Sequence, residues 1–319
     1  GGPMKKYIII SHCHCTDGLC SASLMKKALQ LAYGLDTKIN VVFASYGKEE
    51  DALSKLNMDT KSSYDIFIVD FSFSREQTIS LASKADSLTI IDHHITAAEK
   101  LKDIDKECKN VKFIFDNNMS GATLALKFIQ ENIYSQILDF ENAKVVSKLV
   151  EDRDLWKFNL ENTKPFGEYI FSNIKPNDID AFSKILFRIN HAKLKTIFKT
   201  GKTIQEYKEK QVYEKLSQLV EPKVVSLYGI DFIIVNETQA DLVSEFGNAI
   251  CKKFNMPVCL YKIINEDNVS LSFRSMDNLP DISVVAKNLG GGGHRNACGA
   301  GYTLRELSLL LESKSDDGV

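Results

Sequence analysis

Three short apolar runs in the first third of the chain each lead directly into acidic or imidazole side chains. The runs and the groups behind them are residues 7–10 before His12 to Asp17, residues 66–69 before Asp70, and residues 87–91 before Asp92, His93 and His94. Apolar runs of this length are typical of buried strands. Because ligands of open α/β sheets bind beyond the carboxyl ends of the strands, we expect these side chains to share one site. The pattern favours a metal site.

Strand-like and helix-like segments alternate along the chain. In the first half, apolar residues at helical spacing over 17–34 follow the first strand, and further strands are expected over 39–44 and 111–115. In the last third, strands are expected over 224–227, 232–235, 257–264 and 269–274, and helices over 242–254 and 282–289. This alternation predicts an α/β fold, with an N-terminal parallel sheet flanked by helices and a smaller C-terminal α/β domain.

A helical stretch rich in Lys and Glu separates these two parts. It runs from about residue 178 to residue 219, and its charge is typical of a solvated connector. We therefore expect a first domain over residues 4–190, a helical connector over residues 191–221 and a second domain over residues 222–319. A chain of 319 residues is long enough for two domains.

The overall composition limits which substrates and which cellular compartment are expected. The formal net charge is −2, whereas proteins that follow many phosphates carry a basic stripe, so short anionic substrates fit better than long nucleic acid. No apolar stretch reaches the length of a membrane span, so we expect no membrane partner. Seven cysteines without a Cys-x-x-Cys pair favour reduced thiols and a cytoplasmic protein.

The histidines gather in the motif segments. Five of the six lie there, namely His12, His14, His93, His94 and His294. Imidazole and carboxylate groups suit phosphate-binding metal ions, and a pair of ions about 3.5–4 Å apart needs a carboxylate that bridges them. Asp70 stands alone after its strand and is the candidate bridge. His93 and His94 are adjacent and should point in opposite directions in extended backbone, so that one binds metal while the other faces substrate.

A glycine-rich segment supplies a second candidate binding site. Four glycines at residues 290–293 precede His294 and Arg295. Glycine lets the backbone approach a ligand closely and turn its N–H groups inward, and the absence of a following Lys and Ser or Thr excludes a Walker loop. A flexible linker is the alternative interpretation, but a linker does not need the histidine and arginine that follow.

Together these segments resemble the DHH phosphoesterase family, whose members pair a DHH domain with a smaller DHHA1 domain that carries a Gly-Gly-Gly-His loop. The resemblance covers nearly the whole chain and rests on five separated segments. It implies a hydrolase, a phosphodiesterase in which two divalent metal ions, expected to be manganese, activate the attacking water. It also implies that residues 4–190 form the catalytic DHH domain and residues 222–319 the substrate-binding DHHA1 domain.

The resemblance also implies roles for single residues of the DHH domain. Asp70 is expected to bridge both ions, and Asp17 and His93 to bind the second ion. His94 is expected to contact the scissile phosphate, and Asp92 to orient a histidine. An orienting group of that kind is usual for imidazoles that bind metal. A downstream aspartate completes the metal ligands. It is expected to be Asp154, with Asp152 as the alternative.

The first motif departs from the family's His-x-Asp-x-Asp-Gly form. Aligning it on Asp17 and Gly18 places Cys15 at the position of the first aspartate and moves His12 one residue further away. Either Cys15 binds the first ion as a thiolate, which favours manganese, iron or zinc over magnesium, or it is a small apolar filler that leaves this ion to His12 and the bridge. His14 is a rival ligand, and its alternative is an exposed loop imidazole.

In the DHHA1 domain the resemblance implies a set of residues that bind the far end of the substrate, Arg274, Gly291, Gly292, Gly293 and His294. The catalytic motifs do not determine the substrate within the family. With the near-neutral charge, we expect short RNA or DNA oligonucleotides (nanoRNA and dinucleotides) cleaved to mononucleotides. Cyclic dinucleotides, their linear dinucleotide products and 3′-phosphoadenosine phosphate are alternatives. A non-catalytic nucleotide-binding protein is the alternative of another class, and a homodimer is left open.

Overall fold

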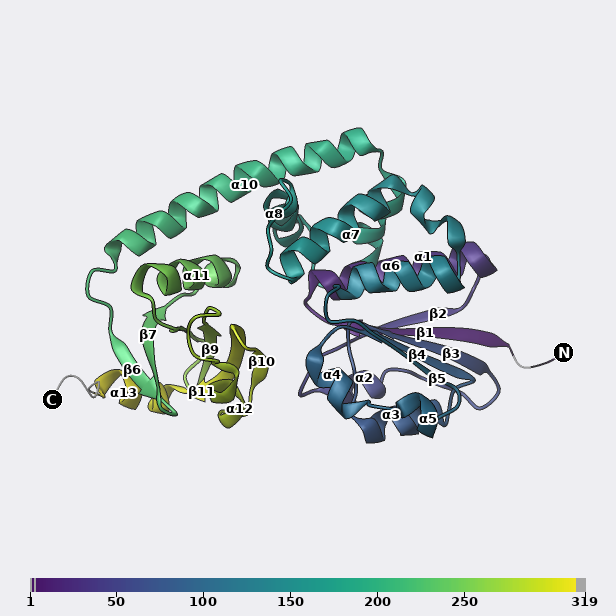
Figure 1. Cartoon of the computed structure of the whole chain (residues 1–319), viewed down its shortest axis with the longest axis horizontal. Helices are drawn as coiled ribbons and strands as arrows, with labels where there is room; N and C mark the ends of the chain where they lie inside the picture. The colour runs from purple at the N-terminus through teal and green to yellow at the C-terminus, as the bar shows by residue number, and fades with distance from the viewer. Residues whose placement is uncertain (1, 3, 314–319) are drawn as a thin grey trace. The chain divides into compact units, whose positions relative to one another are not determined.

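The computed structural model describes residues 2 and 4–313, so the last six residues of the predicted second domain lie outside the described part of the chain. The chain divides into two compact units, residues 1–205 and residues 206–319 (Figure 1). The boundary falls within the long helix α10 (His191–Gln218), in the stretch where the sequence predicts a connector. None of the described helices is both long and apolar enough to cross a membrane.

The first unit is built on a five-stranded sheet in which all strands run parallel, in the order β2-β1-β3-β4-β5. The strands are β1 (Lys5–His12), β2 (Ile39–Ala44), β3 (Ser63–Val69), β4 (Ser87–Asp92) and β5 (Val111–Phe115). The predicted parallel sheet is therefore confirmed. The chain moves from β1 to β2 on one side and then to β3 on the other side of β1, so the strand order reverses there. Ligands of such sheets bind at this reversal, beyond the carboxyl ends of the strands.

Helices cover both faces of this sheet, as the sequence predicts (Figure 1). Successive residues of β1 point to opposite faces, so that Tyr7 and Ile9 join one buried apolar cluster while Ile8 and Ile10 join another. The first cluster includes residues of α1 (Thr16–Tyr33), α6 (Gly121–Asn132) and α7 (Glu141–Asp154), and the second includes residues of α2 (Glu49–Leu53), α3 (Arg75–Ala82) and α5 (Ile104–Glu107). Burial on both faces explains why the strand sequences are continuous apolar runs.

Further helices of the first unit pack around these layers. They are α4 (Ile95–Lys100), the 3₁₀ turn η1 (Ser135–Asp139), α8 (Thr163–Asn173), α9 (Ile179–Ser183) and the π-helical turn η2 (Lys184–Arg188). Phe166 of α8 and Phe182 of α9 lie in the same apolar cluster as α1, with ring centroids 6.3 Å apart. Helix α8 also contacts α7, so this packing supports the end of α7, where Asp154 lies.

The second unit is built on a mixed six-stranded sheet in the order β10-β11-β9-β8-β7-β6. Its strands are β6 (Val224–Leu227), β7 (Ile230–Asn236), β8 (Val258–Ile263), β9 (Asn268–Arg274), β10 (Gly292–His294) and β11 (Ala297–Thr303). After the short turn η3 (Ala240–Leu242), α11 (Val243–Phe254) packs on one face, and α12 (Ser283–Asn288) and α13 (Leu304–Glu312) pack on the other. The smaller α/β domain is confirmed, but part of the glycine segment forms the strand β10 and not a loop.

Candidate metal centre

Three strand ends of the first sheet bring acidic and imidazole side chains together. Strand β1 ends at His12, β3 ends one residue before Asp70, and β4 ends at Asp92, directly before His93. Strands β1 and β4 both pair with β3 in parallel. The side chains that follow the three strands therefore gather at one edge of the sheet, next to the reversal in strand order.

The backbone of Asp70 turns its side chain away from the strand direction. Its φ is +55°, in the left-handed region that few residues other than glycine adopt and that aspartate tolerates better than most. Gly121, the first residue of α6, packs directly against it, because a Cβ at Gly121 would lie only 2.7 Å from the Cβ of Asp70. Backbone conformations of this kind persist only where the surrounding packing holds them, and they cluster at functional sites.

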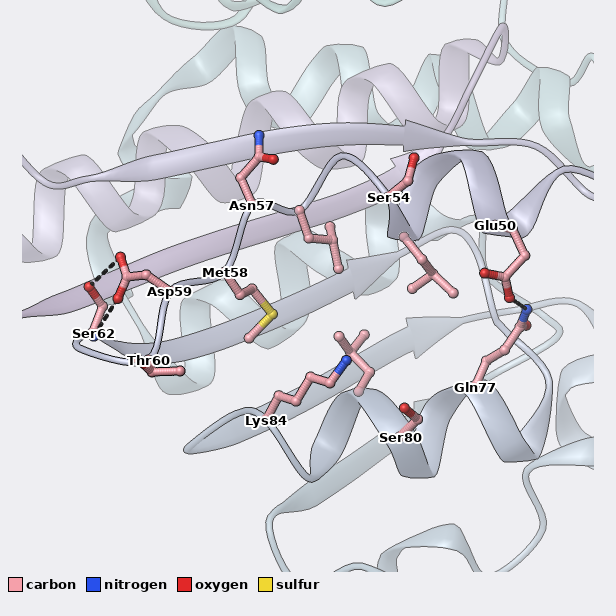
Figure 2. A pocket seen from close by; sticks show the side chains of 13 residues that line it. Glu50, Ser54, Asn57, Met58, Asp59, Thr60, Ser62, Gln77, Ser80 and Lys84 are labelled. Atoms are coloured by element: carbon pink, nitrogen blue, oxygen red, sulfur yellow. Dashed lines mark hydrogen bonds between the residues drawn. The ribbon is translucent and has the colours of Figure 1, made fainter.

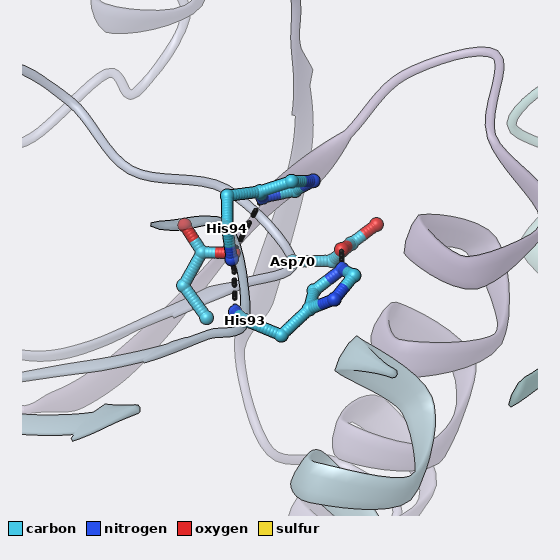
Figure 3. A group of neighbouring side chains, drawn as sticks. Asp70, His93 and His94 are labelled. Carbon is cyan, nitrogen blue, oxygen red and sulfur yellow. Dashed lines mark hydrogen bonds and ion pairs between the residues drawn. The ribbon is translucent and has the colours of Figure 1, made fainter. Parts of the chain in front are cut away.

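The two carboxylate oxygens of Asp70 face different groups. Oδ1 lies 2.9 Å from Nε2 of His93, whereas Oδ2 lies 3.5 Å from Sγ of Cys15 and 3.9 Å from Nδ1 of His12. Figure 3 shows Asp70 beside the ring of His93. A carboxylate with one oxygen toward each of two donor groups has the geometry that a bridge between two cations needs.

Around this carboxylate the donor atoms form groups in which all atoms lie within 4.8 Å of one another. One group is His12, Cys15 and Asp70, another is Asp17, His93 and Asp154, and a further one is Asp70, Asp92, His93 and His94. In the second group, Nε2 of His93 lies 3.3 Å from Oδ2 of Asp17 and 3.6 Å from Oδ2 of Asp154. All six metal ligands expected from the sequence lie in the first two groups.

The charges within these groups favour a bound cation. Burial, and then the negative charge of Asp17, raises the pKa of Asp70 well above its usual value. Desolvation and the charges of Asp17 and Asp70 likewise raise the pKa of Asp154. Burial alone would lower the pKa of His93, but hydrogen bonds and charge from Asp17 and Asp70 raise it to about 11. The repelling carboxylates thus need positive charge between them, and the donor set fits divalent metal ions.

The start of α6 holds Asp17 in place. The backbone N–H groups of Gly121 and Ala122 donate to the two oxygens of Asp17 at 2.8 and 2.7 Å. N–H groups in the first turn of a helix have no partner within the helix, and the helix dipole favours a negative charge there. Burial would raise the pKa of Asp17, but the contact with His93 and these N–H groups lower it. The sequence contains no signal that the amides of this turn bind a residue of α1.

A close approach of β1 and α1 brings His12 and Asp17 to the same place. A Cβ at Gly18 would lie 2.3 Å from the carbonyl oxygen of His12, so only glycine permits this packing. Ser11 adds a hydrogen bond across the turn, from its Oγ to the carbonyl oxygen of Gly18 at 2.7 Å. The Asp-Gly pair of the first motif thus combines a donor group with the residue that lets it approach the strand.

Asp92 orients the ring of His94. Its Oδ1 lies 2.7 Å from Nδ1 of His94 and accepts the backbone N–H of His93 at 2.8 Å, while Oδ2 accepts from Oγ of Ser72 at 2.6 Å. Asp92 is fully buried. Burial would raise its pKa, but the contacts with His94 and Ser72 lower it, so the carboxylate is ionised and accepts a hydrogen bond from the Nδ1–H of His94. The sequence does not single out Ser72, which completes this arrangement.

The prediction that His93 and His94 point in opposite directions is wrong. Their ring centroids lie only 4.3 Å apart, at an angle of 40° between the planes. Strand β4 ends at Asp92 and His94 occupies the N-cap position of α4, so both histidines lie in the turn beyond the strand, where the alternation of side chains along a pleated strand no longer applies. Both rings therefore face the same cluster of donor groups, and the ring of His94 lies 6.2 Å from that of His12.

The alternatives for the downstream aspartate differ in what they contact. Both oxygens of Asp152, on the last turn of α7, accept from the segment that follows: from the backbone N–H groups of Asn159 and Leu160 at 2.9 Å and from Oγ1 of Thr163 at 2.6 Å. Asp152 thus ties the loop after α7 to the start of α8. Asp154, two residues later, is the one whose carboxylate lies near His93.

The two unusual residues of the first motif, Cys15 and His14, have different surroundings. Cys15 precedes the first turn of α1, with its thiol toward Asp70. Burial, and then the charges of Asp70 and Asp17, raises the pKa of the Cys15 thiol well above its usual value, so the thiol keeps its proton unless a cation binds. His14 is exposed, its backbone N–H donates to Oδ1 of Asn177, and it lies in none of the donor groups found among the described residues.

In the second unit, Arg274 and His294 lie in one row across the sheet. His294 of β10 pairs with Ala297 of β11, and Ala297 pairs with Arg274 of β9. Residues in register across neighbouring strands point to the same face, so the two side chains are about 10 Å apart along the row. The guanidinium of Arg274 donates to the carbonyl oxygen of Phe273 at 2.9 Å and to Oγ of Ser244 at 3.2 Å, and burial lowers its pKa.

Glycine is required before His294 for different structural reasons at different positions. A Cβ at Gly291 would lie 2.1 Å from the carbonyl oxygen of Gly299, and a Cβ at Gly293, whose φ is +139°, would lie 2.6 Å from Cα of Cys298. These two glycines permit the close pairing of this segment with β11. At Gly290, whose φ is +83°, and at Gly292 no atom lies within 4 Å of a Cβ. Close approach to a ligand, the reason expected from the sequence, stays a prediction for Gly292.

A groove in the first unit lies apart from all of these residues. It has a volume of about 820 Å³ (Figure 2). Its lining comes from helix α2, from the segment between residues 54 and 62, and from helix α3 with the turn that follows it, between residues 77 and 84. Its lining residues between 54 and 62 lead into β3 and those between 77 and 84 lead toward β4, whereas Asp70 directly follows the carboxyl end of β3. Glu50 and Gln77 form a hydrogen bond of 3.0 Å between its walls. None of the expected site residues lines this groove.

Family comparisons agree with the two-unit structure. The family model described as "DHH family, N-terminal domain" matches residues 6–151, and the model described as "DHHA1 domain" matches residues 229–315. The chain carries a DHH domain followed by a DHHA1 domain. The DHH match covers the first five strands except Lys5 and every residue of the donor groups except Asp154. The predicted family resemblance is confirmed.

Individual relatives are distant. An uncharacterized protein of Acanthamoeba polyphaga mimivirus is 24% identical over 334 residues, which cover 98% of this chain and 71% of that protein. Among solved structures, RecJ of Thermus thermophilus in complex with Mn²⁺ is 11% identical with a TM-score of 0.57, covering 96% of this chain and 51% of RecJ. An exopolyphosphatase-related protein of Bacteroides fragilis is 18% identical with a TM-score of 0.55, covering 96% and 90%. At these identities the likeness shows the fold alone.

Proposed function

We propose that this DHH protein is a metal-dependent phosphodiesterase that hydrolyses short oligonucleotides, including dinucleotides, to mononucleotides. The observation that carries the proposal is the position of Asp70, with one carboxylate oxygen toward His12 and Cys15 and the other toward His93. The family consists of phosphoesterases and exonucleases, which supports a hydrolase. The carboxylate-rich donor set supports divalent cations as the cofactor.

Each donor group would hold one ion. His12, Cys15 and Asp70 would bind the first, and Asp17, His93 and Asp154 the second, with Asp70 shared between them. When bound, a pair of divalent ions supplies positive charge beside the phosphoryl group and lowers the pKa of the attacking water. We propose manganese as the ion, because a thiolate from Cys15 favours it over magnesium.

His94 would bind the scissile phosphate. Asp92 fixes its ring through Nδ1, so Nε2 is the nitrogen turned away from that carboxylate. The ring lies beside those of His12 and His93, at the border of the donor groups. From there a fixed imidazole can hydrogen-bond a phosphoryl oxygen and stabilise the charge that develops on it.

The second unit would bind the far end of the substrate. Arg274 and His294 lie in one row of the sheet, and a guanidinium with an imidazole is a suitable pair for a phosphate or a terminal nucleotide. The net charge of −2 supports short substrates, because a protein that binds many phosphates is normally basic.

The test is the release of mononucleotide from a labelled dinucleotide in the presence of Mn²⁺, by the wild-type protein and by Asp70→Asn. The same assay with longer RNA, DNA, cyclic dinucleotides and 3′-phosphoadenosine phosphate compares the alternative substrates. The proposal expects hydrolysis of the dinucleotide by the wild type and a rate lower by about a hundred-fold or more in the variant. If the wild type binds nucleotides but cleaves no member of the panel, the chain is a non-catalytic nucleotide-binding protein, as the replacement of an aspartate by Cys15 would then explain.

A further inference from the structure

An exposed indole ring lies close to the proposed metal ligands. Trp156, the one tryptophan of the chain, has 46% of its surface exposed. By contrast, Phe71 and Phe73, which follow Asp70 in the sequence, are fully buried and belong to the apolar core. Trp156 thus presents a large aromatic surface outside the apolar core, two residues after the proposed metal ligand Asp154.

The turn after α7 holds Trp156 near the donor groups. Helix α7 ends at Asp154, and the backbone N–H of Trp156 donates to the carbonyl oxygen of Arg153 at 2.9 Å. The φ of Trp156 is +55°, which is unusual for a bulky residue. Two residues span at most about 7 Å between Cα atoms. The Cα of Trp156 therefore lies within about 7 Å of the Cα of Asp154, whose carboxylate lies 3.6 Å from His93.

The neighbours of the indole are rings and cations. The ring of Phe158 packs edge-on against it, with centroids 4.6 Å apart and an angle of 81°. The guanidinium of Arg153 lies over Trp156 at 5.8 Å and over Phe171 at 5.0 Å, and the ammonium of Lys164 lies over Phe158 at 5.1 Å. Exposed aromatic rings combined with cations are the composition of surfaces on which proteins stack nucleic-acid bases.

A second exposed ring near the donor groups is already stacked within the protein. Tyr46 is 42% exposed, but its ring lies on that of Phe71 with centroids 4.4 Å apart and an angle of 24°. Its hydroxyl accepts the backbone N–H of Ser72 at 3.3 Å. The face of Tyr46 is thus covered by another ring. Among the described aromatic contacts, the indole of Trp156 has only an edge-on contact, with Phe158.

We infer that Trp156 is a base-stacking residue, which binds the nucleobase of the nucleotide whose phosphate lies at the metal centre. This inference rests on the proposed function and adds to it a contact with the base beside the contacts with the phosphate. Every base has an aromatic face, so stacking on Trp156 accepts different sequences but requires that a base be present.

Intrinsic fluorescence tests this contact directly, because Trp156 is the one tryptophan of the chain. The wild-type protein is titrated with AMP and, separately, with ribose 5-phosphate, in the presence of the metal ion and with excitation beyond the absorption of adenine. These ligands share sugar and phosphate and differ in the base. Stacking predicts that AMP changes the emission in a saturable way and that ribose 5-phosphate does not. Equal responses to both ligands, or none to either, would overturn the inference.

Two substitutions separate the ring from the backbone conformation. Trp156→Phe keeps an aromatic face, and Trp156→Asn removes it while retaining a residue type that adopts positive φ readily. For dinucleotide hydrolysis, loss of stacking should raise KM about ten-fold in Trp156→Asn and less in Trp156→Phe, with kcat nearly unchanged. Tyr33→Ala is the matched control, because Tyr33 is 56% exposed and stacks on Tyr7 at the start of β1.

The outcomes distinguish this inference from the proposed function. Hydrolysis by the wild type with the same KM in Trp156→Asn would refute stacking and leave the phosphodiesterase proposal intact. A base-dependent change of fluorescence without hydrolysis of any substrate would refute the phosphodiesterase proposal and support stacking as a binding contact. If Trp156→Asn also loses affinity for Mn²⁺, the turn around Asp154 has moved, and the fluorescence of the wild type decides.

Discussion

Asp70 illustrates how a residue can be required for function and unfavourable for the fold. Its pKa is raised by burial and by the charge of Asp17, so at neutral pH the ionised carboxylate is less stable in the folded chain than in the unfolded one. Its φ of +55° adds backbone strain. Both costs are explained if the carboxylate is stabilised by bound cations, which add stability only to the folded state.

The substitution Asp70→Asn therefore has opposite effects on activity and on stability without metal. Asparagine has the same shape and tolerates the same φ, so the change removes the charge alone. We expect kcat to fall by about a hundred-fold to a thousand-fold. The thermal midpoint in a chelator should stay equal or rise, and the increase in that midpoint caused by Mn²⁺ should shrink. A clear loss of stability in the chelator would contradict the role of charge repulsion.

Cys15 is the residue that should set the choice of metal. If its thiolate binds the first ion, replacing it with a carboxylate, the group present in the common family motif, should favour harder ions. For Cys15→Asp we expect the ratio of kcat/KM in Mg²⁺ to that in Mn²⁺ to rise by about ten-fold or more. Cys13→Ser, in the same turn but outside the donor groups, is the control. An unchanged ratio in Cys15→Asp would support the alternative that this cysteine only fills space.

At the scale of elements, strands could be predicted from the sequence better than the contacts at their ends. The bounds expected for the second and fifth strands, 39–44 and 111–115, are those of β2 and β5, because strands buried on both faces are short apolar runs. The sequence does not indicate strand β11, since the strand consists mainly of Gly, Ala and Cys and contains one β-branched residue, Thr303. The side chains that gather beyond the strands depend on the turn at Asp70, which no sequence pattern specifies.

Two helices show the limits of local patterns in different ways. Helix α8 contains Pro165 and Gly167, which argue against a helix, yet proline is tolerated in a first turn and Gly167 leaves room for Arg153, whose Cδ would lie 3.2 Å from a Cβ there. Helix α13 begins with a capping box between Thr303 and Glu306. This pair of residues is a sequence signal for the start of a helix.

The start of α6 gives a prediction that concerns an element as a whole. Alanine normally stabilises a helix relative to glycine by about 0.5–1 kcal/mol. At Gly121 the sign should be reversed, because a Cβ would lie 2.7 Å from the Cβ of Asp70 and would push the helix away from both Asp70 and Asp17. For Gly121→Ala we expect a loss of about 1–3 kcal/mol in the free energy of unfolding and a weaker affinity for Mn²⁺.

Chemical denaturation and metal titration measure the two effects on Gly121→Ala. Gly301→Ala is the matched control, since no atom lies within 4 Å of a Cβ at Gly301 and its backbone is not left-handed; its free energy of unfolding should change by less than about 0.5 kcal/mol. A Gly121→Ala variant that is more stable than the wild type and binds Mn²⁺ equally well would show that α6 does not need this close approach.

At the scale of the whole molecule, the two units contribute different parts of one proposed task. The first carries the donor groups for metal ions, and the second carries the row formed by Arg274 and His294. Neither part alone accounts for selective hydrolysis of short nucleotides, because charge beside a phosphate accelerates the reaction of any phosphodiester, whereas recognition of length requires contacts with a second point on the substrate.

If the second unit binds the far end of the substrate, His294→Ala should affect the hydrolysis of a dinucleotide more than that of a small phosphodiester. With a dinucleotide, KM should rise about 10-fold to 100-fold while kcat stays nearly constant, which is the pattern of lost uniform binding. With bis(p-nitrophenyl) phosphate, which lacks a second nucleotide, neither constant should change. His191→Ala supplies the control, because His191 is also exposed and lies at the start of α10. An equal loss on both substrates would mean that His294 acts on the reacting phosphate, and an unchanged KM for the dinucleotide would mean that the glycine segment does not bind it.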